Sequence, residues 1–288
     1  MTAERTRRTV EVRSAGRALS VECGMGLVAA WPQVAQHIPG ACDAPPQESD
    51  HGVAAGVVVP DDAADARRLI NAHLHVIHVA AGTVPVHAVA VQRPGAGAVL
   101  LLGGHGAGKT LVGVALALRG WQWLAGDVAL VDVPAEGGPV VRGGTSAVLG
   151  RRDPLRRWFP ELDLPEEGPG VVDLRQQRAL QPAPVSVPVV AAVLVDVDGD
   201  PARRAALERL DRHTVATAWL LASGHLLERL LDEGEQPLRL LEDEMALRRR
   251  IRCVRALAGL VGAHLARGAP QEIAARIERL TDDRQVRT

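Results

Sequence analysis

The octapeptide GGHGAGKT at residues 103–110 constrains this chain more than any other segment. It matches the pattern G-x-x-x-x-G-K-[ST], in which glycines permit positive φ angles and let backbone N–H groups turn inward around an anion. The apolar run AVLLLG (98–103) precedes it and an apolar run over 111–118 follows it. A helix over 109–118 would add the positive end of its dipole beneath the anion. The sequence therefore predicts a phosphate-binding loop between a buried strand and a helix.

Lys109 is the only lysine in the chain, although Lys and Arg together number 33. Heavy use of Ala, Arg, Gly and Val indicates GC-rich coding, which favours arginine elsewhere. An ammonium is a compact point charge that suits a tight loop better than a planar guanidinium does. In such loops the lysine reaches nucleotide phosphates and the following hydroxyl ligates Mg²⁺. We therefore predict an ATP and Mg²⁺ site formed by Gly103, Gly104, His105, Gly106, Ala107, Gly108, Lys109 and Thr110.

A second metal ligand is expected at the end of a core strand. Asp127 follows WLAG, 18 residues after Lys109, and is the first candidate; Asp132 is a weaker one toward the far end of the same strand. An acid this soon after the loop argues against ABC-type and RecA-type ATPases, whose second acid comes much later. Small-molecule kinases have an early acid, but their loop opens the chain, whereas here about 100 residues precede it. We predict that Thr110 and Asp127 hold the metal.

The order of elements predicts an α/β fold with a central mixed sheet. Residues 1–82 are expected to form a small α/β segment, 83–200 the nucleotide-binding core, and 201–288 a helical portion packed on that core. Expected strands are 9–14, 18–23, 84–91, 98–103, 123–133 and 185–198, with 84–91 and 98–103 forming an antiparallel hairpin. Expected helices are 61–80, 109–118, 153–159, capped by Asp153, and 237–266, the longest.

The segment VPVHAVAV…GAVLLLGGHGAGKTLVGVALALRGWQWLAGD resembles the nucleotide-binding core of the HPr kinase family and its relatives, which share a fold with phosphoenolpyruvate carboxykinase. The matching residues are His87-Ala88, the loop from Gly103, Arg119-Gly120 and Asp127. The resemblance covers 84–133 well and extends weakly to the basic segment RQQRAL (175–180). It implies a carboxykinase-like fold, a kinase activity, His87 in the active site, and Arg178 as a phosphate contact.

One departure from that family pattern concerns the catalytic base. The family's paired aspartates correspond here to Gly126-Asp127, and the first of the pair is the acid/base in HPr kinases. The base is therefore open among Asp127, His87 and a group from elsewhere. The N-terminal section is also short and unlike that of HPr kinases, so HPr is not the expected substrate. The chain is predicted to phosphorylate a hydroxyl of a peptide, protein or small metabolite; the alternative is an ATP-binding regulatory or scaffold protein without catalysis.

The composition of the chain argues against two classes of binding partner, nucleic acids and membranes. A net charge of −1 and scarce aromatic residues argue against nucleic acid, and no apolar run is long enough to span a membrane. No secretory signal is visible, and three widely spaced cysteines fit reduced thiols, so a cytoplasmic protein is expected. The basic run RRRIR (248–252) is interpreted as a solvated helix face, with docking of an acidic partner as the alternative. Whether the chain forms a homo-oligomer stays open.

Overall fold

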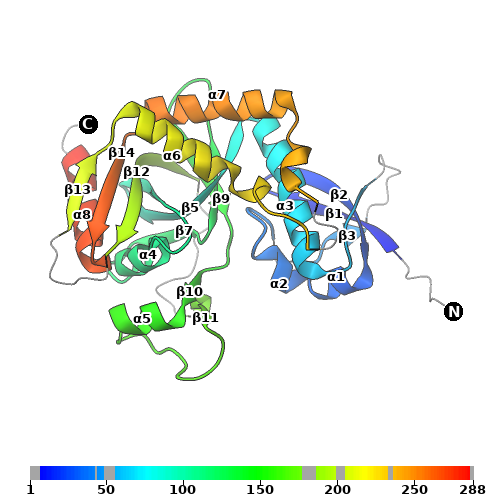
Figure 1. Ribbon diagram of the computed structural model, residues 1–288, viewed down its shortest axis with the longest axis horizontal. Coiled ribbons are helices and arrows are strands. Elements are labelled where there is room, and N and C mark those ends of the chain that lie inside the picture. The colour runs from blue at the N-terminus through cyan, green and yellow to red at the C-terminus, as the bar shows by residue number, and fades with distance from the viewer. Residues whose placement is uncertain are drawn as a thin grey trace.

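The computed structural model of the chain describes residues 7–42, 44–48, 56–176, 186–198, 205–232 and 236–285. The fold is mixed α/β. A large mixed sheet has helices on both faces, and a smaller sheet near the N-terminus lies beside it (Figure 1). The expected α/β class is confirmed at this level.

The N-terminal sheet has the strand order β3-β1-β2-β4. Its central pair is antiparallel and corresponds to the strands expected over 9–14 and 18–23. The bounds are β1 (Arg7–Ser14), β2 (Arg17–Gly24), β3 (Gln47–Glu48), β4 (Val57–Val58), α1 (Met25–Ala29), α2 (Trp31–Ala35) and α3 (Ala63–Ala80). The expected helix over 61–80 is α3, whose first turn is capped by the Asp62 carboxylate accepting from the N–H groups of Ala64 and Asp65. These elements share one core, to which Val12, Trp31 and Ile70 contribute.

The large sheet has the order β13-β14-β12-β6-β5-β8-β9, and β7 also pairs with β5. The bounds are β5 (Thr83–Arg93), β6 (Gly97–Leu102), β7 (Gln122–Ala125), β8 (Val128–Asp132), β9 (Val140–Gly144), β12 (Val187–Val197), β13 (Ala206–Arg209) and β14 (Ala263–Gly268). The expected antiparallel hairpin is β5–β6, whereas β12 runs parallel to both β6 and β14. The start of β12 also pairs with β9, so pairing through β6, β5, β8 and β9 returns to β12.

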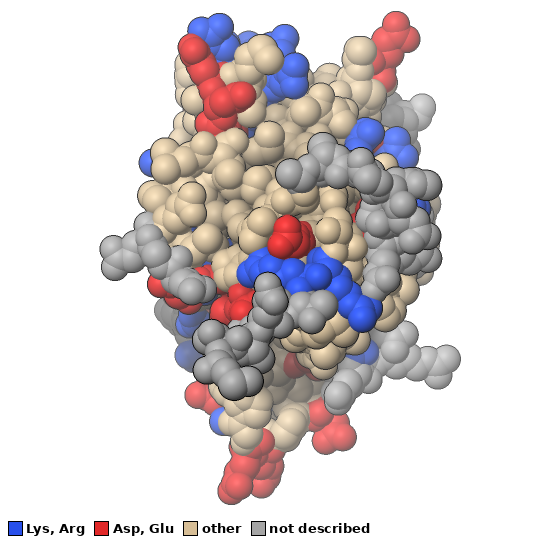
Figure 2. All heavy atoms as spheres, turned by 90° about the vertical axis from the view of Figure 1, so that its right-hand side faces the viewer, with Lys and Arg blue, Asp and Glu red and all other residues tan. Residues whose placement is uncertain are grey.

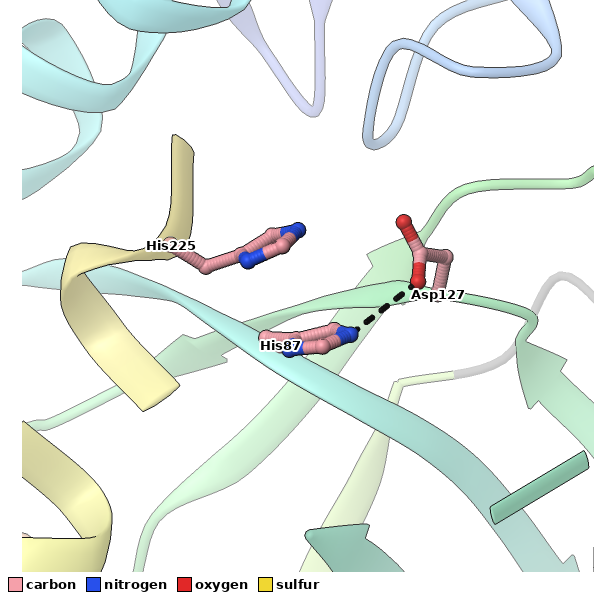
Figure 3. Close-up of side chains that lie close together, drawn as sticks. All are labelled: His87, Asp127 and His225. Atoms are coloured by element: carbon pink, nitrogen blue, oxygen red, sulfur yellow. Dashed lines mark ion pairs between the residues drawn. The ribbon is translucent and has the colours of Figure 1, made fainter. Parts of the chain in front are cut away.

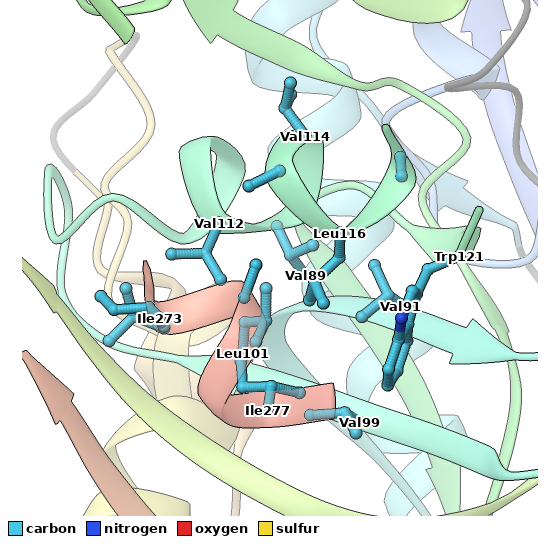
Figure 4. Packing of buried hydrophobic residues seen from close by; sticks show 14 of the residues in the cluster. Val89, Val91, Val99, Leu101, Val112, Val114, Leu116, Trp121, Ile273 and Ile277 are labelled. Carbon is cyan, nitrogen blue, oxygen red and sulfur yellow. The ribbon is translucent and has the colours of Figure 1, made fainter. Parts of the chain in front are cut away.

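Strands β5 and β6 are buried on both faces, which explains their almost continuous apolar sequence. Val89, Val91, Val99 and Leu101 pack against α4 (Lys109–Ala117) and α8 (Pro270–Gln285), as Figure 4 shows. The alternate residues of both strands belong to the second core cluster, with α6 (Arg212–Gly224) and α7 (Glu244–Leu260). This two-sided packing fixes the point at which β6 ends and the glycine loop begins.

Between β9 and β12 the chain forms a small lobe beside α4 (Figure 1). The lobe contains β10 (Leu149–Arg151), α5 (Arg152–Trp158), β11 (Val171–Asp173) and the 3₁₀ turn η1 (Leu174–Gln176), with β10 and β11 antiparallel. The short helix expected over 153–159 is α5, but Asp153 lies within its first turn, and the N-cap is Arg151 without a side-chain cap. Two further 3₁₀ turns, η3 (His225–Leu227) and η4 (Leu238–Leu241), follow α6.

Two other expectations need correction. The strand expected over 123–133 is divided into β7 and β8 at Gly126 and Asp127. The helix expected over 237–266 ends at Leu260, and residues 263–268 form β14, which lies parallel to β12. The run GLVGAHLARG is apolar enough for either state, and pairing with distant strands decides the outcome. The portion after residue 200 is therefore not purely helical, because β13 and β14 extend the sheet.

Charges of both signs are interspersed on the face that carries the N-terminal sheet. Figure 2 shows basic side chains gathered near the middle of this face, with acidic side chains beside them and at the rim. The strands there contribute ion pairs such as Arg13 with Glu11. Among the described helices, none has the length and apolarity needed to cross a bilayer.

Candidate functional site

The glycine loop connects the end of β6 to the start of α4. Gly103, Gly106 and Gly108 have φ values of +145°, +82° and +93°. Position 108 needs glycine for two reasons: its φ angle is positive, and a Cβ there would lie 2.2 Å from Cγ2 of Val197 on the neighbouring strand β12. Positive φ angles of this kind disfavour residues with a Cβ, so glycine is favoured at all three positions. The loop conformation thus depends on the glycines and on the parallel pairing of β6 with β12.

Lys109 is folded over the loop that precedes it. Its Nζ donates to the carbonyl oxygens of Gly103 at 2.9 Å and Gly104 at 3.2 Å, and only 8% of the residue is exposed. Burial lowers the pKa of Lys109, and the charge on Asp127 opposes that shift. Thr110 Oγ1 donates to the carbonyl of Leu149 at 3.3 Å, which links the start of α4 to the small lobe. The two polar side chains of the motif therefore lie at the N-terminal end of α4.

Asp127 occupies the turn that separates β7 from β8. The N–H groups of Asp127 and Val128 both donate to Thr145 Oγ1, at 2.9 and 3.1 Å, which holds the turn in place. The carboxylate lies 3.3 Å from Nε2 of His87 on β5. Burial raises the pKa of Asp127, but hydrogen bonding to His87 and the charges of His87, His225 and Lys109 outweigh it and bring the pKa to about 2. Asp127 is therefore ionised at neutral pH.

His225 completes the site and was not predicted from the sequence. Its ring stacks on that of His87, with centroids 3.8 Å apart and 14° between the planes, as Figure 3 shows. Burial first, and then the charge of His87, lower the pKa of His225 to about 4, so it is neutral at neutral pH. His225 begins η3, directly after α6, and nothing in the sequence around it indicates a site. Its position depends on how α6 packs against β5.

The side chains of this cluster could hold a divalent cation. His87, Asp127 and His225 each offer a ligand atom, and these atoms lie within 4.8 Å of one another. Two imidazole nitrogens and a carboxylate suit transition metals, whereas Mg²⁺ prefers oxygen ligands. The hydroxyl of Thr110 and the carboxylate of Asp127 supply such oxygen ligands at the edge of the glycine loop. The residues present fit a divalent cation, with Asp127 common to both sets.

One cavity of about 380 Å³ contains most of the predicted site. Residues 104–110 of the loop line it, together with His87 and Asp127. The sequence missed three basic side chains that also line it: His37, Arg151 and Arg229. Arg151 Nη2 is 2.6 Å from Nε2 of His105, which joins the small lobe to the loop. The loop residues predicted from the motif, Asp127 predicted from the strand end, and His87 predicted from the resemblance therefore line the same cavity.

Gly126 has a structural reason to lack a side chain. A Cβ at this position would lie 1.8 Å from the carbonyl oxygen of Ala147 and 3.2 Å from Cα of Val148. The same backbone segment is held by a hydrogen bond from the N–H of Gly126 to the carbonyl of Thr145 at 3.0 Å. Residues 145–148 therefore occupy the space that an acidic side chain would need.

Other candidates from the sequence have different positions. Arg178 lies outside the described residues. Asp132 accepts from Thr83 Oγ1 at 2.6 Å and pairs with Arg142, at the opposite end of β8 from Asp127. The run RRRIR is only partly a solvated face, because Arg250 is buried and forms a two-bond ion pair with Glu242, at 2.6 and 2.8 Å.

No family model and no curated protein matches this chain. Among solved structures, the Hpr(Ser) kinase/phosphatase from Coxiella burnetii aligns with 70% of this chain and 97% of its own, at 11% identity and a TM-score of 0.32. A TM-score of this size carries no functional argument. The chain itself shows a mixed α/β fold in which a glycine-rich loop, Lys109, Asp127 and His87 line one cavity, with His225 close to His87 and Asp127.

Proposed function

We propose that this chain is an ATP-dependent kinase that transfers the γ-phosphoryl group to a hydroxyl, in an HPr kinase-like manner and on a carboxykinase-like sheet. The observation that carries the proposal is the meeting of Lys109, Asp127 and His87 at the cavity beneath the loop over 104–110. The strand, glycine loop and helix in direct succession are the arrangement that binds nucleotide phosphates.

In this proposal the loop and α4 bind the phosphates of ATP. Backbone N–H groups of the loop and the N-terminal end of α4 face the phosphate oxygens, and Lys109 exchanges its two carbonyl contacts for the β- and γ-phosphates. Thr110 and Asp127 hold Mg²⁺, which supplies neutralisation of phosphate charge when bound. These groups stabilise the charge on the transferring phosphoryl group, which is the main catalytic requirement of this reaction.

The pair formed by His87 and Asp127 receives the proton of the acceptor. The acceptor oxygen forms a bond to the γ-phosphorus, the bond from that phosphorus to the β–γ bridging oxygen breaks, and ADP leaves. The acceptor proton passes to the pair, whose carboxylate and imidazole are 3.3 Å apart. In this role His87 takes up the proton, and the ionised carboxylate of Asp127 beside it stabilises the charge that results. With the proton received in this way, the reaction does not require an acidic side chain at position 126.

A second function, ATP binding for regulation or scaffolding without catalysis, is favoured by one observation. The position of the acid/base in HPr kinases is Gly126 here, and it is closed to any side chain by Ala147. If His87 and Asp127 do not replace that base, the protein would bind ATP without transfer.

Acceptor-dependent turnover separates the two functions. The protein is incubated with Mg·ATP, alone and with serine-containing peptides, free L-serine or glycerol, and ADP formation is followed. A kinase forms ADP faster with at least one acceptor, and Asp127→Asn lowers that rate by about 100-fold or more. Tight ATP binding with no acceptor-dependent ADP formation would support the scaffold function instead.

A further inference from the structure

The cavity extends beyond the residues that the proposed reaction uses. His37 follows α2, Arg151 ends β10, and Arg229 lies just after η3, yet all three line the same space of about 380 Å³ as the glycine loop. They therefore come from the N-terminal segment, the small lobe and the portion after α6. Convergence of basic groups from three separate segments on one cavity requires a reason beyond packing.

The basic side chains divide into two sets by position. Lys109 and Arg151 lie at the loop, because Lys109 bonds to Gly103 and Gly104, and Arg151 bonds to His105. Arg229 lies beside the stacked histidines, where its Nη2 is 3.5 Å from Nε2 of His225. Since His225 stacks on His87, Arg229 is adjacent to the place where the acceptor hydroxyl must lie.

The positive charge near Arg229 is not balanced by a carboxylate of its own. Within the described ranges, Arg229 has no acidic group at ion-pair distance, and Asp127 is the one acidic side chain lining the cavity. The guanidinium of Arg67 on α3 is partly buried, and burial, followed by the charges of Arg68 and Arg229, lowers its pKa. Arginine stays protonated at neutral pH in any case. Arg229 therefore brings a positive charge to the lining of the cavity.

His37 adds a hydrogen-bonding group to the lining of the same cavity. Burial and the charge of Arg67 lower the pKa of His37, so its ring is neutral and one nitrogen carries a donor hydrogen. Its backbone is fixed, because the side-chain amide of Asn71 donates to the His37 carbonyl at 3.0 Å. A guanidinium and an imidazole N–H that line one cavity can together bind a carboxylate or a phosphate.

We propose that the acceptor of the kinase reaction carries an oxyanion, a carboxylate or a phosphate, near its hydroxyl, and that Arg229 binds this group with His37. The N-terminal segment thus supplies part of the acceptor site. This proposal rests on the proposed kinase function, since it is the reacting pair that defines the acceptor side of the cavity.

The test is a binding measurement that does not depend on turnover. Protein saturated with the non-transferable analogue Mg·AMP-PNP, so that the loop is filled, is titrated with glycerol, D-glycerate and glycerol 3-phosphate. A peptide ending in serine is compared with its C-terminal amide in the same way. At least one charged probe should bind roughly tenfold or more tightly than its neutral counterpart. The probe that does so distinguishes carboxylate from phosphate, and metabolite from peptide.

Arg229→Gln should remove this preference, because the amide has no charge to offer. Arg239→Gln is the matched control, since Arg239 is also exposed and lies on η4 outside the cavity. Equal binding of charged and neutral probes to the wild type, or an unchanged preference in Arg229→Gln, would overturn the proposal. Failure of Mg·AMP-PNP to bind would count separately, against the kinase function.

Discussion

The imidazole rings of His87 and His225 stack at 3.8 Å with only 14° between their planes (Figure 3). The two residues come from β5 and η3, so the contact joins the strand before the glycine loop to the end of α6. The pKa of His225 is lowered to about 4 by burial and by His87, which leaves His225 neutral. The cluster therefore places the Asp127 carboxylate beside the His87 ring, with a neutral His225 ring stacked on that ring.

If His225 acts by stacking on His87, a flat apolar ring at position 225 should serve the same purpose. His225→Ala should lower kcat by about tenfold or more, because His87 loses the ring that orients it. His225→Phe keeps a ring at the same place and should restore most of the activity. The measurement is kcat for both variants with the best acceptor. A phenylalanine variant as impaired as the alanine variant would contradict the stacking role and indicate that a nitrogen of His225 is needed.

Any side chain at Gly126 should disturb the turn that holds Asp127. A Cβ would lie 1.8 Å from the Ala147 carbonyl oxygen, so Gly126→Ala should destabilise the protein by about 2 kcal/mol or more, with a loss of activity. Urea unfolding measures the effect. Gly138→Ala is the control, because nothing lies within 4 Å of its Cβ position and its φ is not positive. A Gly126→Asp variant of normal stability and higher activity would show that this position is open.

The Arg250–Glu242 pair should make stability depend on acid pH. Burial raises the pKa of Glu242, but His75 and Arg250 more than offset it, so the pKa falls from 4.5 to about 2. The folded state thus favours the ionised form. The stabilisation is present above pH 4.5 and is lost as the pH falls toward 2. Glu242→Gln should cost on the order of 3 kcal/mol at neutral pH, because Arg250 is left buried without its partner.

The corresponding measurement is urea unfolding of wild type and Glu242→Gln between pH 7 and pH 2. The difference in unfolding free energy should shrink as the pH falls below 4.5. Glu244→Gln is the control, since its pair with Arg248 is exposed, with side-chain exposures of 77% and 72%, and should contribute little. A Glu242→Gln difference that stays constant down to pH 2 would mean that the carboxylate does not titrate as the ion pair requires.

The parts of the molecule that local sequence determines were predictable. The strand, glycine loop and helix over 98–118 follow from apolar runs and glycine spacing, and the hairpin β5–β6 from two apolar runs joined by a turn. Those elements carry Lys109 and Thr110, and the strand that follows brings in Asp127. The resemblance implied that His87 lies in the site, but its position beside Asp127 depends on antiparallel pairing of β5 with β8, which the sequence did not predict.

The remainder depends on contacts between distant segments. The sequence predicts helix over residues 263–266, whereas the segment forms β14, because pairing with β12 and β13 decides between the two states of an apolar run. His225, Arg229 and His37 lie in no motif; tertiary packing brings Arg229 and His37 to the cavity and stacks His225 on His87. The carbonyl oxygen of Ala147 occupies the space that a side chain at position 126 would need, and Ala147 is close to that position only in the folded chain.

The central claim is that the loop around Lys109 binds Mg·ATP for transfer of its γ-phosphoryl group. The most direct measurement is acceptor-dependent formation of ADP from Mg·ATP by wild type, Lys109→Ala and Lys109→Arg, with Mg·ATP binding measured in parallel. We predict that both variants lose at least about 100-fold in kcat/KM, because a neutral group or a planar guanidinium cannot replace the ammonium. Full phosphoryl transfer by Lys109→Ala would contradict the account.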